Sequence, residues 1–128
     1  MSWTADPLER RRAERDRLLA RAREHVEGLA RRMPVAGAAV VGSVARGDFN
    51  VWSDVDLLLV FRSPAAKSPA RLAALVAIAP PGIQIVAWST DEFVQACRAG
   101  NPIAREALAV GEVLHGEGVL RSLAETDR

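Results

Sequence analysis

Apolar residues recur along the first part of this chain at a helical spacing. Between 7 and 33 they occur every three or four residues: Leu18, Ala22, Val26, Leu29 and Met33. This spacing is typical of a helix with one apolar face and one solvated face. Asp6 and Pro7 form a typical helix start, because aspartate accepts from the first free amides and proline suits the first helical position. The pattern predicts a helix over 7–33.

Further along, short apolar runs bounded by glycine, proline and polar residues predict strands. These runs cover 35–41, 54–61, 83–88 and 112–115. Punctuating residues, including a capping box of Ser89 and Glu92, predict the helices that separate or follow the strands. These helices cover 70–79, about 89–99 and 101–110. The order strand, helix, strand over 54–88 predicts a crossover to a parallel neighbour.

The whole chain, 1–128, is expected to form a single α/β (α+β) domain with a β-sheet flanked by helices. At 128 residues it is long enough for a real core and too short for two ordinary domains. Residues 116–128 are expected to be loosely held.

The charge of the chain is nearly balanced, with a net charge of +1. Nine arginines lie between Glu9 and Arg32, but five acidic residues and no aromatic residue are interleaved with them. This mixture indicates a solvated helix face, and nucleic acid is not an expected partner. A nucleic-acid face on this helix remains the weaker alternative.

Cysteine content and hydropathy bound the expected location. Cys97 is the sole cysteine, so an internal disulfide is excluded and a reduced, cytoplasmic setting is expected. The first residues, Met1 to Pro7, lack the apolar core of a signal peptide. No apolar run approaches the roughly 20 residues of a membrane span, so no membrane association is expected.

Two acids, Asp54 and Asp56, stand at the start of the most apolar run. Alternate side chains of a strand share a face, so the two carboxylates should lie side by side. Two neighbouring carboxylates cannot both stay ionised at low cost unless a cation neutralises them. Mg²⁺ is commonly held by one or two carboxylates and substrate phosphates. The pair therefore predicts a Mg²⁺ or Mn²⁺ site.

A glycine and a serine end the preceding strand. Gly42 lets a ligand approach the backbone closely, and amides of a helix that starts here would point together at a phosphate-sized anion. Arg46 could pair with phosphate or be solvated. Taken alone, Gly42 and Ser43 are more simply explained as an ordinary strand-to-helix turn, but their distance from Asp54 and Asp56 in the sequence favours the phosphate-binding interpretation.

The spacing of these residues adds a family resemblance. Gly42 and Ser43 are followed by ten residues and then by Asp54 and Asp56. This resembles the G-S-x10-D-x-D signature of the nucleotidyltransferase superfamily related to DNA polymerase β, in its minimal single-domain form, over about 35–116. The resemblance implies a polymerase β-like fold with a small mixed β-sheet flanked by helices, in which Asp54 and Asp56 are catalytic and hold divalent ions. It also implies an NTP, with ATP as the first candidate, bound by Gly42, Ser43, Arg46 and Ser53.

The sequence departs from the family where a third carboxylate would be expected. That position, on the strand over 83–88, holds Gln84, and no Asp or Glu occurs between Asp56 and Asp91. Glutamine cannot act as a base, a contribution typically worth about 10² to 10⁴ in rate. Asp91 and Glu92 are better explained by the start of a helix than by the site.

Two functions stay open on these grounds. The first is a Mg²⁺-dependent transfer of a nucleoside monophosphate from an NTP to a hydroxyl acceptor, which family analogy places on a partner protein. The second is a weakly active or inactive nucleotide-binding, antitoxin-like subunit that binds a helical partner of the HEPN type.

Overall fold

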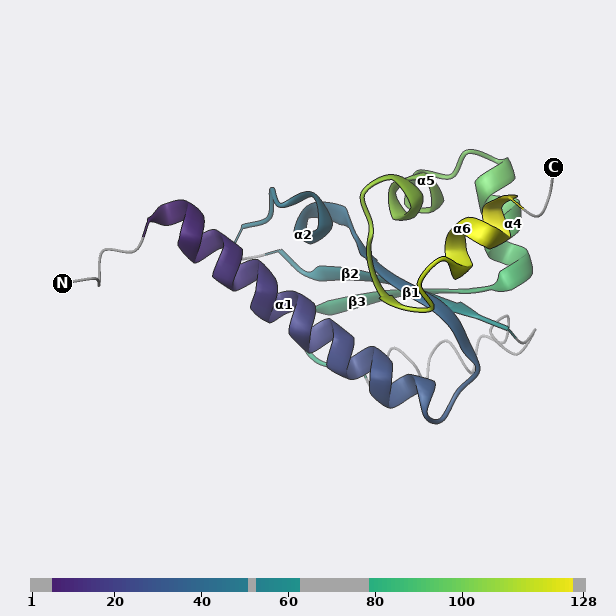
Figure 1. Ribbon diagram of the computed structural model, residues 1–128, viewed down its shortest axis with the longest axis horizontal. Helices are drawn as coiled ribbons and strands as arrows, with labels where there is room; N and C mark the ends of the chain where they lie inside the picture. The colour runs from purple at the N-terminus through teal and green to yellow at the C-terminus, as the bar shows by residue number, and fades with distance from the viewer. Residues whose placement is uncertain (1–5, 51–52, 63–78, 126–128) are drawn as a thin grey trace.

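A four-stranded mixed sheet lies at the centre of the protein (Figure 1). The computed structural model describes residues 6–50, 53–62 and 79–125. In spatial order the strands are β3 (Ile83–Ser89), β2 (Val55–Phe61), β1 (Val35–Val41) and β4 (Glu112–His115). β1 is antiparallel to β2 and β4, whereas β2 and β3 are parallel. The predicted mixed sheet and parallel pair are confirmed, and the predicted helix over 70–79 lies outside the described residues.

Helices cover both faces of this sheet (Figure 1). The long helix α1 (Pro7–Ala30) packs on one face, and α4 (Thr90–Arg98), α5 (Pro102–Ala109) and α6 (Val119–Glu125) pack on the other. Along β2, Leu57 and Leu59 point to the first face and Leu58 and Val60 to the second. Burial on both sides explains why the strand sequences are continuously apolar rather than alternating.

The predicted apolar stripe of α1 forms the contact with the sheet. Leu19, Ala22, Val26 and Leu29 are buried, and Leu18 and Met33 are partly buried against the same cluster. The Asp6 carboxylate accepts a hydrogen bond from the amide of Leu8 at 3.0 Å, and proline occupies the first turn. Among the described residues, no helix is long and apolar enough to cross a membrane.

The expectation that residues 116–128 are loosely held is wrong for most of that segment. Residues 119–125 form α6, and Leu120 is only 4% exposed. Leu120 packs on β1 where Gly37 has no side chain: a Cβ built at Gly37 would lie 3.0 Å from Leu120 Cδ2. Apolar residues at 119, 120 and 123 give this short segment a helical face, and it docks because β1 leaves room for it.

Candidate functional site

The site lies at the edge of the sheet where β1 ends and β2 begins. Val41, the last residue of β1, pairs with Asp56, and Asp56 pairs in turn with Gln84 on β3. Asp54 lies just before β2 and is exposed. Paired residues of neighbouring strands point to the same face, so Asp56 and Gln84 are neighbours on the face covered by α5. The register thus places Gln84 opposite the acid pair.

Gly42 meets Asp56 more closely than a side chain would allow. It begins the short helix α2 (Gly42–Arg46) with a φ of 75°. A Cβ added to Gly42 would lie 2.3 Å from Oδ2 of Asp56. The left-handed backbone would strain an ordinary L-residue here, and its Cβ would have to displace the Asp56 carboxylate. The turn after β1 and the Asp56 carboxylate on β2 are therefore in direct contact, so the position of one constrains the position of the other.

The pKa of Asp56 is raised above its ordinary value. Burial of the carboxyl is the largest cause, and the negative charges of Asp54 and Glu106 add to it. The positive charge of Arg46 acts in the opposite direction but does not cancel the others. The site therefore concentrates negative charge, which a cation would neutralise.

Glu106 is the functional-site residue that sequence reasoning missed. It lies on α5, and its Oε1 accepts hydrogen bonds from the Gly42 amide at 2.8 Å and from Arg46 Nη1 at 2.6 Å. Arg46 also donates from Nε to Asp48 Oδ2 at 3.2 Å. No local pattern distinguishes Glu106 from any acid on a helix, and only the packing of α5 beside β1 brings it to the site.

Ser43 and Ser53 take part in the turns on either side of the loop between β1 and β2. The Ser43 carbonyl accepts from the amide of Gly47 at 2.8 Å, where α2 ends in a left-handed residue. Ser53 Oγ accepts from the Asn50 amide at 3.0 Å, and its own amide donates to the Asn50 carbonyl at 3.0 Å. Their expected nucleotide contacts stay predictions.

Two arginines of α1 donate hydrogen bonds to the backbone of α2 and of the loop that follows it. Arg15 donates from Nε to the Val44 carbonyl at 2.9 Å and from Nη2 to the Ala45 carbonyl at 3.1 Å. Arg11 donates to the Phe49 carbonyl and lies over the Phe49 ring at 5.0 Å. The Arg15 contacts satisfy carbonyls of α2 that its short length leaves without partners, and the Arg11 contact satisfies a carbonyl of the loop that follows α2.

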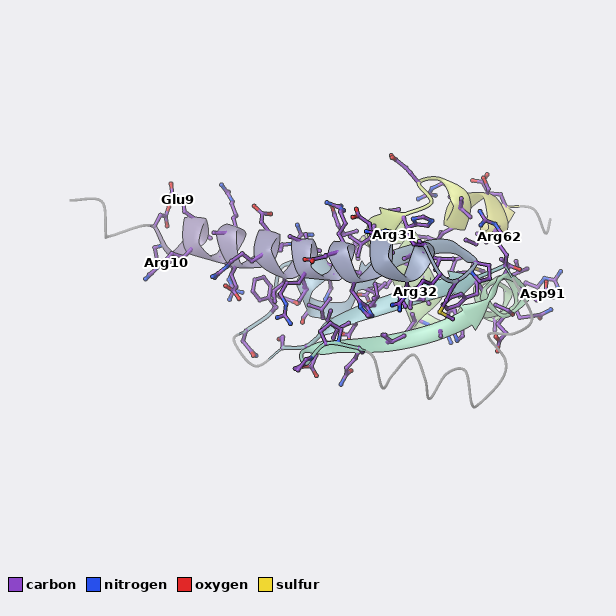
Figure 2. All side chains as sticks on the ribbon, turned by 90° about the horizontal axis from the view of Figure 1, so that it is seen from below. Glu9, Arg10, Arg31, Arg32, Arg62 and Asp91 are labelled. Atoms are coloured by element: carbon purple, nitrogen blue, oxygen red, sulfur yellow. The ribbon has the colours of Figure 1, made fainter. Side chains whose placement is uncertain are left out.

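The interpretation of Glu92 as part of a helix start is confirmed. Ser89 Oγ accepts from the Glu92 amide, and Glu92 Oε1 accepts from the Ser89 amide, which completes a capping box for α4. Ser89 pairs with Phe61, five strand positions beyond Gln84, or about 16 Å along the strand. In Figure 2, Asp91 lies at the opposite end of the molecule from Glu9 and Arg10.

The donor chemistry of the site fits a hard divalent cation. Asp54, Asp56 and Gln84 offer oxygen atoms alone, which suits Mg²⁺ or Mn²⁺. Within the described part of the chain, no group of three or more His, Cys, Asp or Glu side chains is arranged to hold a metal ion. An ion held here would need further oxygens from water or from a phosphate ligand, as Mg²⁺ commonly does.

Comparison with known proteins identifies the family of the chain. The model of the nucleotidyltransferase domain family matches residues 22–95, more than half of the chain. The chain belongs to this family. The match includes Gly42, Asp56 and Gln84 but ends before Glu106. This nucleotidyltransferase domain also resembles a solved protein from Sulfolobus solfataricus described as a "putative nucleotidyltransferase". The two are 26% identical with a TM-score of 0.57, over 64% of this chain and 76% of the other. No curated protein matches the chain.

Substituting Gly42 by alanine should cost more stability than the same change at Gly100. Both glycines have positive φ values, 75° and 69°, so both variants carry backbone strain of about 1 to 2 kcal/mol. A Cβ at Gly100 meets no atom within 4 Å, whereas at Gly42 it displaces the Asp56 carboxylate. In urea unfolding, we expect Gly42→Ala to lower the free energy of unfolding by about 1 kcal/mol more than Gly100→Ala does. Equal losses would show that the contact with Asp56 is unimportant.

Asp56→Asn should stabilise the metal-free protein at neutral pH. Because folding raises the pKa of Asp56 above its ordinary 3.8, the folded state holds the proton more tightly than the unfolded state. Ionisation therefore lowers the free energy of unfolding as the pH rises through and above that value. Without the carboxylate, we expect a Tm about 1 to 3 °C higher at pH 7 and no difference near pH 3. Asp16→Asn, at an exposed position of α1, should leave the Tm unchanged, and a lower Tm for Asp56→Asn would contradict the prediction.

Proposed function

We propose that this nucleotidyltransferase domain transfers a nucleoside monophosphate from an NTP, with ATP as the first candidate, to a hydroxyl group, and that it requires Mg²⁺ or Mn²⁺. Membership of the family supports the reaction class. The observation that carries the proposal is the contact of Gly42 with Asp56, because it joins the proposed phosphate-binding turn to the proposed metal ligands. A triphosphate held by the turn would lie beside the two carboxylates.

In this reaction the acceptor oxygen bonds to the α-phosphorus. The bond from that phosphorus to the bridging oxygen breaks, and pyrophosphate leaves. Asp54 and Asp56 would hold the divalent ions, which neutralise phosphate charge and make the acceptor hydroxyl more acidic when they are bound. Arg46 and the amides of Gly42 and Ser43 would bind and orient the phosphates.

Gln84 limits the rate in this proposal. It lies opposite Asp56 and is exposed, so its amide can bind water or substrate. An amide cannot remove the proton of the acceptor hydroxyl, so this proton must pass to solvent or to a phosphate oxygen. The expected result is slow transfer rather than none, because a general base typically contributes about 10² to 10⁴ in rate.

A second function is favoured by Gln84 itself. A domain without its third carboxylate could serve as a nucleotide-binding, antitoxin-like subunit whose purpose is to bind a helical partner of the HEPN type. In that case Asp54 and Asp56 would contribute to nucleotide binding at most. The partner would bind at another part of the surface. The two proposals differ in what happens when a carboxylate is placed at position 84.

Calorimetric titration of ATP with and without Mg²⁺ tests the nucleotide site. We expect binding that depends on Mg²⁺ and that Asp54→Asn weakens by roughly tenfold or more, because a charged ligand is lost. Asp16→Asn removes the same charge from the exposed side of α1 and should bind as the original protein does. If ATP, GTP and CTP all fail to bind in the presence of Mg²⁺, the proposed function is wrong.

Gln84→Glu tests whether a missing base limits the transfer. The substitution keeps the shape of the side chain and adds a group that can accept the proton. We expect faster Mg²⁺-dependent release of pyrophosphate from ATP with extract proteins as acceptors, by about 10². Gln84→Asn, which stays uncharged, is the control and should give no increase. A Gln84→Glu rate equal to that of the original protein would favour the binding subunit.

A further inference from the structure

One oxygen atom of Glu106 accepts hydrogen bonds from two donors that the proposed function assigns to a phosphate. Its Oε1 lies 2.8 Å from the Gly42 amide nitrogen and 2.6 Å from Arg46 Nη1. The Glu106 side chain is 25% exposed, whereas that of Arg46 is 45% exposed. A carboxylate oxygen and a phosphate oxygen make the same kind of charge-assisted hydrogen bond to such donors. Glu106 therefore occupies the place of an anion.

A phosphate oxygen and the Glu106 carboxylate cannot share this place. The single amide hydrogen of Gly42 points to one acceptor, and two anions at hydrogen-bond distance from it would repel each other. Arg46 is further committed by Asp48, whose Oδ2 accepts from Nε at 3.2 Å. An arriving triphosphate thus meets donors that already have anionic partners.

Glu106 can leave without a change in the fold. It is held by the backbone of α5, which packs against β1 and α4 through buried Ala104 and Ala107. Its carboxylate is at the end of a side chain with three rotatable bonds, so rotation alone would release Gly42 and Arg46. The competition needs no movement of α5.

We propose that Glu106 is an internal competitor that occupies the Gly42 amide and Arg46 in the free protein and must be displaced when a nucleotide binds. The inference rests on the proposed function. Its consequence is a nucleotide affinity below that of the open site, because the apparent affinity falls with the fraction of protein in which the site is open. In the opposite role, Glu106 would be a brace, a side chain that holds Arg46 in position for phosphate. Removal of Glu106 would then weaken nucleotide binding.

The experiment compares Glu106→Gln and Glu106→Ala with Asp48→Asn. All three remove one negative charge near Arg46, but only the first two change the partner of the Gly42 amide. We expect calorimetric titration with ATP and Mg²⁺ to show binding about three- to tenfold tighter for the Glu106 variants than for Asp48→Asn. Unchanged or weaker binding by both Glu106 variants would overturn the proposal and indicate a brace.

Hydrogen exchange of the Gly42 amide, measured by NMR, separates failure of this inference from failure of the proposed function. In the free protein, Glu106→Ala should exchange this amide several-fold faster, and saturating ATP with Mg²⁺ should restore its protection. Restored protection supports the competition directly. If the amide depends on Glu106 but no protein binds a nucleotide, the contact exists while both the proposed function and the competition are wrong. If nucleotide binds without protecting the Gly42 amide in Glu106→Ala, the competition alone is wrong.

Discussion

The close approach of the Asp56 carboxylate to the backbone of Gly42 is the constraint on which the site depends. It follows from the antiparallel register of β1 and β2, which pairs Val41 with Asp56. The next residue, Gly42, then has its backbone beside the Asp56 carboxylate. A one-residue slip of this register would turn every β2 side chain to the other face, and both faces are buried. The apolar core on either side of the sheet thus sets the position of the acid.

Charge is the second organising feature of the site. The pKa of Asp56 is raised first by burial of its carboxyl and then by the negative charges of Asp54 and Glu106, which act against the positive charge of Arg46. Such an arrangement lowers stability in the absence of a cation, which is the usual relation between a functional site and the fold that carries it. Arg11 and Arg15 of α1 donate to carbonyls of α2 and its loop rather than to these acids.

Local patterns predicted the fold well because most of its helices and strands are specified by residues that lie close together in the sequence. Apolar spacing gave α1, β1 and β4, and paired capping residues gave the start of α4. The crossover order predicted that β2 and β3 are parallel neighbours, and the family resemblance placed Gln84 where a third carboxylate would be expected. The register that pairs Gln84 with Asp56 is seen only in the structure. α6 was missed because seven residues give little periodicity, and its stability comes from Leu120 filling the space above Gly37.

The sequence by itself determined the strands, the family and the acid pair, since each is encoded by residues within one element or one short spacing. The mixed sheet was implied by the family resemblance, and the pairing of four separate strands forms it. Only the tertiary structure decided which groups face the Gly42 amide and Arg46. Glu106 lies 64 positions from Gly42 in the chain and reaches it because α5 packs beside β1. A hydrogen bond between such distant residues leaves no local pattern, because its partners are set by packing and not by sequence spacing.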